Sequence, residues 1–270
     1  MFSYRILLVA TVLSTVTNTL AHPQLSQRAD KPACVNKHWD FRSMRELGDD
    51  WVKTDGPLKF SSEGLVMGMK PPTNFEQYES DKGEIFNVDL GTGFGMNASF
   101  HMQFGRVTAT MRASTNKGII TNLVAMGDNG DEIDTEFVGG HPDRFESNYF
   151  WGEDLIYTVN GGKHAVSSPN GIGDWHEYSI NWTPEKLEWY LDGTLVRTRL
   201  QSDTCSGRGC VYPTAPARIQ LGIWDGSQET PSWSTGPVDW SSMSEHERKS
   251  IHGVVQSISV ECNPTYNDIV

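Results

Sequence analysis

Acidic side chains recur at every second position of the segment that runs from residue 132 to residue 136. In a β-strand, alternate side chains point to the same face, so Glu132, Asp134 and Glu136 would share one face and the residues between them the other. Three carboxylates without an intervening basic residue repel one another. A functional role for the carboxylates would explain why the sequence keeps this repulsion.

The spacing of the two glutamates fits a pair of catalytic carboxyl groups. Their α-carbons would be about 13 Å apart on a strand, and side chains that lean toward each other would bring the carboxyls to about 5 Å. A retaining glycosidase needs that separation, whereas an inverting one needs room for a water. We assign Glu132 as nucleophile and Glu136 as general acid/base. The charge of Asp134 would raise the proton affinity of the acid, and its hydrogen bond would orient the nucleophile.

Two plainer interpretations of the acidic run stay open. One is a solvated acidic strand. The other is a calcium loop, because oxygen-bearing side chains stand at Asp128, Asn129, Asp131, Glu132 and Asp134. An EF-hand loop requires glycine at its sixth position, and the sixth residue counted from Asp128 is Ile133. Paired C-x-x-C or His spacings are absent as well, so we expect neither a metal nor a cofactor.

The motif Glu-Ile-Asp-Thr-Glu-Phe followed by Val-Gly-Gly resembles the signature of glycoside hydrolase family 16, in the form with an unbulged catalytic strand. Within that family it is most similar to the fungal Crh-type cell-wall transglycosylases, and the resemblance runs from about residue 85 to 240. The flanking similarity lies in residues 104–107, 111–113, 147–150, 175–178, 189–193, 212–213 and 216–224.

The resemblance implies an all-β fold, a jelly-roll sandwich of two antiparallel sheets with a concave substrate cleft. It places substrate contacts on the strand after the catalytic one. Each candidate contact can equally be a packing residue; the candidates are Asn148, Tyr149, Trp182, Trp224 and Trp233. Asp225 and Glu229 are further candidates for the lining of an acceptor groove.

The activity that the resemblance implies is that of a secreted retaining glycosidase or transglycosylase. Its substrate would be β-glucan or chitin of the fungal cell wall, and the mechanism would be a double displacement by two carboxylates. One alternative is a hydrolytic β-1,3-1,4-glucanase, because the unbulged strand also resembles lichenases. Another is a non-catalytic glycan-binding jelly roll, which would not need both glutamates.

Charge and aromatic content agree with a neutral polysaccharide as partner. The formal net charge of -12 and the pI near 5.1 argue against nucleic acid and against anionic membranes, since phosphate neutralisation would have the wrong sign. Nine Trp, eight Tyr and eleven Phe supply flat apolar faces, most of which will be core. We expect a monomer.

Short strands separated by turns must position the carboxylates. Apolar stretches bounded by Gly, Pro, Asn and Asp cover residues 64–69, 84–88, 106–112 and 119–126, which is typical of a sandwich. Asn160-Gly161-Gly162 and Asp192-Gly193 are hairpin turns, the second between strands at 187–191 and 195–198. Only residues 243–251 have a helical pattern.

The chain divides into four predicted segments. Residues 1–21 are a signal peptide, 22–33 a leader, 34–262 one catalytic domain and 263–270 a polar tail. The apolar run of the signal peptide is too short to span a membrane, and the tail lacks the hydrophobic end of a GPI signal. We therefore expect a secreted protein, extracellular or in the cell wall.

Four cysteines in a secreted chain predict two disulfides, with three possible connectivities. The short loop between Cys205 and Cys210 favours that pair, which leaves Cys34 to meet Cys262. The sequons at Asn97 and Asn181 predict N-glycosylation.

Overall fold

The computed structural model describes residues 31–152, 160–207 and 209–270. Residues 31–270 form one compact unit. The predicted signal peptide and most of the predicted leader lie outside the described residues. No helix of the described part is long and apolar enough to cross a membrane.

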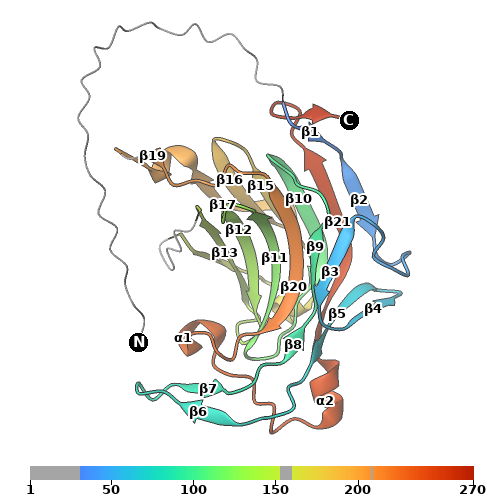
Figure 1. The fold of residues 1–270 in the computed structure, drawn as a ribbon, viewed down its shortest axis with the longest axis vertical. Coiled ribbons are helices and arrows are strands. Elements are labelled where there is room, and N and C mark those ends of the chain that lie inside the picture. Colours follow the sequence, from blue (N-terminus) through green and yellow to red (C-terminus); the bar gives the residue numbers. More distant parts are fainter. Residues whose placement is uncertain (1–30, 153–159, 208) are drawn as a thin grey trace, which may run out of the picture. The chain divides into compact units, whose positions relative to one another are not determined.

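One large sheet carries the acidic strand near its middle (Figure 1). Within the described residues it has seven strands, all paired antiparallel, and β12 lies between β13 and β11. In spatial order the strands are β14 (Gly162–Ala165), β13 (Arg144–Phe150), β12 (Glu132–Val138), β11 (Ile119–Gly127), β20 (Ala217–Asp225), β9 (Gly95–Ala98) and β3 (Trp51–Asp55).

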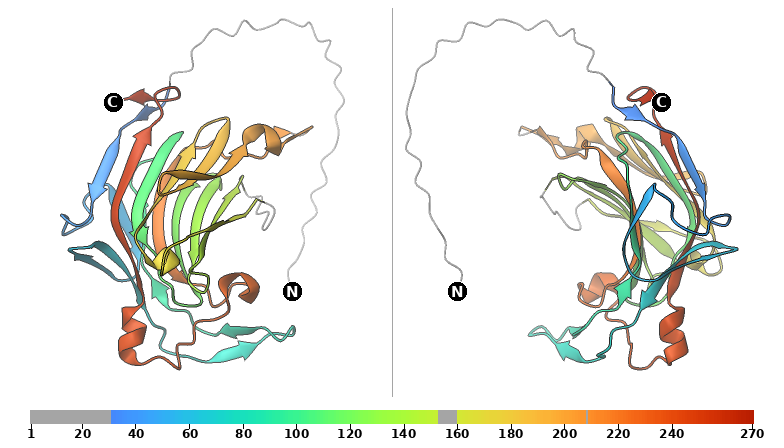
Figure 2. Two further views of the ribbon diagram at one scale, coloured as in Figure 1. Left: turned by 180° about the vertical axis from the view of Figure 1, so that it is seen from behind. Right: turned by 45° about the vertical axis from the view of Figure 1, so that its right-hand side comes forward.

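A second antiparallel sheet packs against the first, and both views of Figure 2 show the two layers. Its main path in the described residues is β17 (Thr194–Leu200), β16 (Lys186–Leu191), β15 (His176–Trp182), β10 (Gly105–Arg112), β21 (His252–Cys262), β5 (Gly64–Lys70) and β4 (Leu58–Ser61). Off this path, β2 (Lys37–Asp40) pairs with β21, and β8 (Thr92–Gly93) pairs with β5.

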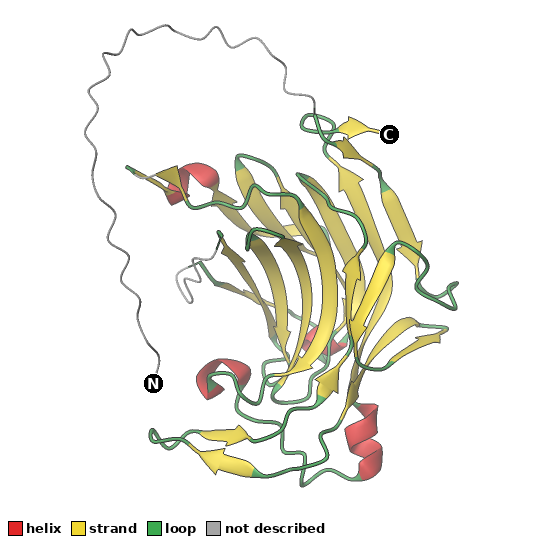
Figure 3. Cartoon of the chain, in the orientation of Figure 1, coloured by secondary structure: helices red, strands yellow, loops and turns green. Residues whose placement is uncertain are grey.

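The remaining elements of the described chain are short (Figure 3). The hairpins are β6 (Gln77–Glu79) with β7 (Ile85–Asn87), and β18 (Cys205–Ser206) with β19 (Gly209–Cys210). The helices are α1 (Pro231–Ser234), α2 (Glu245–Ser250) and the 3-10 turns η1 (Gly171–Gly173) and η2 (Gln201–Thr204). Helix α2 confirms the predicted helical segment, and a capping box of Ser244 and Glu247 starts it.

The hydrophobic core lies between the two large sheets. Strand β10 alternates strictly, with Val107, Ala109 and Met111 buried and the residues between them partly exposed. The rings of Phe137 on β12 and Tyr178 on β15 meet edge to face at 4.5 Å between centroids. Burying one such ring stabilises the fold by about 1.5–3 kcal/mol. The predicted all-β sandwich of two antiparallel sheets is confirmed.

The turn at Asp192-Gly193 confirms the predicted hairpin between β16 and β17. Both residues have positive φ, 49° and 75°, which is the backbone of a type I′ turn. Such a turn matches the right-handed twist of the strands that it joins.

The two ends of the described unit are tied together. A disulfide joins Cys34 to Cys262, and β1 (Ala33–Cys34) pairs in parallel with β22 (Asp268–Ile269). The segment predicted as a polar tail thus supplies a strand that pairs with Ala33 and Cys34. The domain limits of 34–262 stay a prediction. The second disulfide joins Cys205 to Cys210, so both bonds are the pairs that the short loop favoured.

Candidate active site

The carboxylates of β12 lie on the face of the strand that is turned away from the core. Glu132 and Glu136 are partly exposed, whereas Asp134 between them is only 2% exposed. Ile133 and Phe137, on the other face of the strand, point into the core. The alternation expected from the sequence therefore holds, and the two glutamates are neither sealed under packed side chains nor turned to opposite faces.

Strand β12 is regular along its whole length. Its pairing with β11 runs from Val138 opposite Ile120 to Glu132 opposite Met126 without a shift in register. The pairing with β13 is also continuous. An extra residue would bulge the strand and disrupt its pairing locally. The predicted unbulged form is thus present, and it keeps Glu132 and Glu136 on one face.

Asp131, directly before β12, anchors the start of the strand. Its side chain is 2% exposed and accepts three backbone hydrogen bonds, from Gly152 at 2.9 Å, Thr214 at 2.8 Å and Ala215 at 2.9 Å. A carboxylate with three N–H donors is well satisfied despite burial. Sequence reasoning placed Asp131 only in a calcium loop and missed this role, because the donors come from distant segments.

The backbone of Asp134 is held from the opposite sheet. The indole Nε1 of Trp189 on β16 donates to the carbonyl oxygen of Asp134 at 2.9 Å. Trp189 is itself fully buried. This bond crosses the core and fixes the middle of β12 relative to the second sheet.

The two glycines that follow β12 allow close approach of other chain segments. A Cβ on Gly139 would lie 2.1 Å from the carbonyl oxygen of Asn116, and one on Gly140 would lie 2.1 Å from Oγ1 of Thr235. Thr235 ends helix α1 in the left-handed region, at φ 74°. The Val-Gly-Gly part of the motif therefore lets α1 pack against the end of the carboxylate strand.

Neighbouring strands add side chains to the same face, because directly paired residues share a face of the sheet. We call this the carboxylate face. It consists of Glu132, Asp134 and Glu136 with Glu146, Asn148 and Phe150 on β13, Asn122, Val124 and Met126 on β11, and Arg218, Gln220 and Gly222 on β20.

Four of these side chains carry unsatisfied buried oxygens. In the described part of the chain, Oδ1 of Asn122, of Asp134 and of Asn148 and Oε1 of Glu146 have no hydrogen-bond partner. Such atoms are costly unless water or a ligand pairs with them. Hydroxyl groups of a sugar are suitable donors. Asn122 was missed from the sequence, although its place in an expected strand was visible.

Burial and mutual repulsion raise the proton affinity of the carboxyls. Burial, the charge of Glu132 and the charge of Glu136 raise the pKa of Asp134 well above its usual value. Burial, followed by the charges of Glu132, Glu146 and Glu229, raises the pKa of Glu136 to about 8. Glu136 therefore holds a proton at neutral pH, as a general acid must.

These pKa shifts predict how stability depends on pH. A folded pKa near 8 against an ordinary value of 4.5 means that the folded state keeps a proton that the unfolded state loses. The free energy of unfolding should then fall as pH rises toward 8. Burial lowers the pKa of His164 from 6.5 to about 4, so ionisation of this residue makes the free energy of unfolding rise with pH between these values. The effect of Glu136 is therefore best measured between pH 6.5 and 8, where His164 is neutral in the folded state and largely neutral in the unfolded state.

We expect a loss of about 1–2 kcal/mol across that window, measured by urea unfolding. In Glu136→Gln this slope should become shallower, with the remainder due to Asp134, while Glu177→Gln on the other sheet should keep the full slope. Equal slopes in wild type and Glu136→Gln would contradict the assignment of the raised pKa to Glu136.

Three of the predicted sugar contacts are partly exposed beside the carboxylates. Asn148 pairs with Asp134 across the strands. Trp224 is paired with Ile120 at the end of β20, and its ring lies 6.0 Å from that of Trp233 on α1. These three remain candidates.

The structure contradicts the predicted contacts of Tyr149 and Trp182. Both are 1% exposed and belong to the core. Tyr149 follows Asn148 directly, so on a strand it must face the opposite way. The indole Nε1 of Trp182 donates to the carbonyl oxygen of Pro213 at 3.0 Å, inside the sandwich.

Of the two acidic residues predicted to line an acceptor groove, Asp225 does not and Glu229 remains a candidate. Asp225 is buried, and its carboxylate accepts hydrogen bonds from Trp240 Nε1 and the Gly91 amide, both at 2.8 Å. It therefore has a structural role. Glu229 is exposed, and its charge acts on Glu136.

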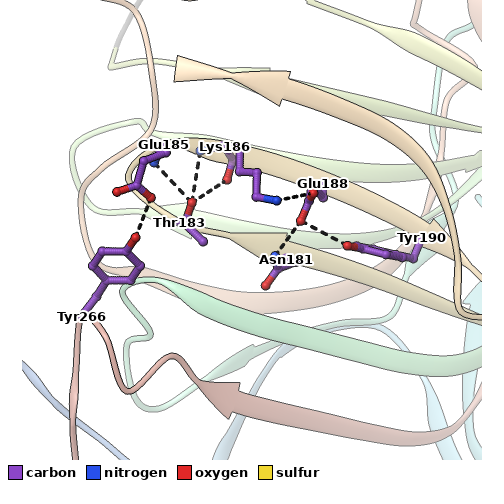
Figure 4. Close-up of polar contacts among 7 residues, drawn as sticks. All are labelled: Asn181, Thr183, Glu185, Lys186, Glu188, Tyr190 and Tyr266. Atoms are coloured by element: carbon purple, nitrogen blue, oxygen red, sulfur yellow. Dashed lines mark hydrogen bonds and ion pairs between the residues drawn. The ribbon is translucent and has the colours of Figure 1, made fainter. Parts of the chain in front are cut away.

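The two sequons lie on different sheets. Asn97 on β9 pairs with Gln220 and so faces the same side as the carboxylate face. Asn181 lies on β15, and its Nδ2 donates to Oε2 of Glu188 at 2.8 Å (Figure 4). Occupancy of both sequons stays a prediction. In the described residues, no three His, Cys, Asp or Glu side chains form a group suited to a metal ion.

A comparison with protein families identifies the chain. The model of glycosyl hydrolases family 16 matches residues 50–242. The chain belongs to this family. Within family 16 it is similar to Crh-like protein 2 of Aspergillus fumigatus, 34% identical over 251 residues that cover 86% of this chain and 52% of that protein. A Crh-like protein of Arthroderma benhamiae is 37% identical, covering 77% of this chain and 51% of that protein. The chain thus spans about half the length of these relatives.

Solved structures of carbohydrate-active proteins share the fold. A Crh5 transglycosylase in complex with NAG is 25% identical, with a TM-score of 0.67, covering 87% of this chain and 88% of that chain. A prokaryotic β-1,3-1,4-glucanase (lichenase) from a mouse hindgut metagenome is 17% identical, with a TM-score of 0.62, covering 85% of this chain and all of that one, and is alike in fold alone.

Proposed function

We propose that this family 16 chain is a retaining glycosidase and transglycosylase acting on β-glucan or chitin of a fungal cell wall. The observation that carries the proposal is the arrangement of β12. Glu132 and Glu136 flank a buried Asp134 on one face, and the pKa of Glu136 is raised to about 8. The similarity to Crh-like proteins and to a transglycosylase that binds NAG supports the choice of substrate class.

In the first step, Glu136 donates its proton to the glycosidic oxygen as the bond from that oxygen to the anomeric carbon breaks. The bonding electrons leave with the oxygen. A carboxylate oxygen of Glu132 bonds to the anomeric carbon and forms a glycosyl-enzyme. Buried Asp134, which keeps its own proton, donates a hydrogen bond that orients the carboxyl of Glu132.

In the second step, the deprotonated Glu136 takes a proton from the acceptor hydroxyl. The acceptor oxygen attacks the anomeric carbon, and Glu132 leaves as a carboxylate. Both displacements invert the anomeric centre, so the net result is retention. The same two side chains serve water and sugar acceptors alike.

The identity of the acceptor decides between hydrolysis and transfer. We expect a chitin oligomer and a labelled laminari-oligosaccharide to give a labelled hybrid product, resolved by chromatography and mass spectrometry. Shorter chitin products without a hybrid would replace the transferase with a hydrolase. A hydrolytic β-1,3-1,4-glucanase is the second candidate, since the unbulged strand β12 also suits that class, and lichenan cleavage would reveal it. Binding without any product would leave a glycan-binding module.

We further propose that the protein is secreted to the extracellular space or the wall. Two disulfides support this, because such bonds form and persist in oxidising compartments. The 1–21 segment predicted as a signal peptide agrees with the same route.

A further inference from the structure

Glu146 on β13 is a fourth carboxyl group beside the catalytic pair, and the proposed mechanism leaves it without a task. It stands directly opposite Glu136 in the register of β12 and β13. Its side chain is 13% exposed. An acidic residue this deeply placed, next to another acid, requires compensation from its surroundings.

One oxygen of Glu146 holds an aromatic ring in place. The indole Nε1 of Trp233 donates to Oε2 of Glu146 at 3.1 Å. The ring of Trp233 lies 6.0 Å from that of Trp224, with an angle of 30° between their planes. Helix α1, which carries Trp233, has only four residues, so its own backbone constrains the indole weakly. The hydrogen bond to Glu146 thus fixes one ring of the pair.

The other oxygen of Glu146 faces cations at longer range. Oε1 is 3.4 Å from Nζ of Lys163 and 3.8 Å from Nε of Arg144. Among the described residues, this oxygen is buried without a hydrogen-bond partner. The cations neutralise the field of Glu146 only in part, since its charge still contributes to the raised pKa of Glu136.

Several charged side chains lie around Glu136 and can influence its pKa. Its own strand supplies Glu132 and Asp134, the segment after β20 supplies Glu229, and β11 supplies the uncharged Asn122. Besides Glu146, the nearby charges of β13 and β14 are the two cations already described. Glu132 must stay as nucleophile and Asp134 orients it, whereas Glu229 is exposed. Glu146 is therefore the largely buried carboxylate in this set to which the proposed mechanism gives no task.

We propose that Glu146 is a positioning residue with two effects: its carboxylate fixes the indole of Trp233 beside Trp224, and its charge keeps the proton on Glu136. The inference rests on the proposed function. It joins the binding of a sugar ring to the protonation of the acid through one side chain.

Two substitutions separate these effects. In Glu146→Gln the amide oxygen still accepts from the indole, but the charge is lost. We expect the basic limb of the kcat/KM profile to move down by about 0.5–1 pH unit, with KM for an oligosaccharide donor unchanged. In Glu146→Ala the limb should move equally, and KM should rise about 5- to 10-fold because the indole loses its acceptor.

Trp233→Phe provides the reverse pattern, because it removes the indole N–H and keeps the charge. Here KM should rise and the basic limb should stay in place. Glu177→Gln, a charge change on the other sheet, should alter neither quantity. Circular dichroism checks that each variant is folded.

If the basic limb of the kcat/KM profile does not move in Glu146→Gln, the proposed electrostatic effect is wrong. If KM is unchanged in Glu146→Ala, the proposed positioning of Trp233 is wrong. A wild-type protein without activity on any glycan would contradict the proposed function instead. The two failures are therefore distinguishable.

Discussion

Glu132→Gln should lower turnover by about 10³-fold or more on every glycan that the wild type processes. An amide oxygen cannot form the glycosyl ester, so the first displacement stops. The rate is measured as release of reducing ends or of hybrid product under saturating donor.

The fold should survive this substitution. Glutamine has nearly the same volume, and its amide oxygen can still accept the hydrogen bond from protonated Asp134. The melting temperature should therefore stay nearly equal, while Glu177→Gln should keep full activity. A full rate in Glu132→Gln, or a loss of activity that merely follows unfolding, would show that the nucleophile is assigned wrongly.

Glu136→Ala should have the second largest effect, and its size should depend on the leaving group. Natural glycans leave as poorly stabilised alkoxides and need the proton, so we expect a loss of about 10²- to 10⁴-fold. A dinitrophenyl glycoside leaves without protonation, and its first step should be much less affected. Small anions such as azide should then restore turnover, giving a glycosyl azide of retained configuration.

The pH profile provides an independent check on the same residue. Because Glu136 must be protonated to act and burial raises its pKa to about 8, kcat/KM should fall about tenfold per pH unit above 8. In Glu136→Ala, assayed with the activated glycoside, this basic limb should disappear. An equal loss on both substrates, with the limb intact, would assign the acid to another residue.

The carboxylate strand could be predicted from the sequence because its geometry is local. Alternation with period two decides which side chains share a face, and no distant contact is needed to see it. The same rule could have prevented one error, since the adjacent Asn148 and Tyr149 cannot face the same side of a strand. The resemblance located that strand, but it did not say which residue points into the core.

Other parts of the site depend on contacts that are distant in sequence. Asp131 binds amides at Gly152 and at residues 214–215, and Glu146 binds the indole of Trp233, 87 residues away. These pairs form only once the sheet has brought its strands together. For the same reason, the pairing of the polar segment after Cys262 with β1 could not be predicted from the sequence.

Trapping the glycosyl-enzyme tests the central claim most directly. The protein is incubated with an activated 2-deoxy-2-fluoro glycoside of a chito- or laminari-oligosaccharide, digested, and mapped by tandem mass spectrometry. The account predicts one glycosyl adduct, as an ester on the side chain of Glu132. An adduct on another residue, or turnover with inverted configuration and no adduct, would contradict it.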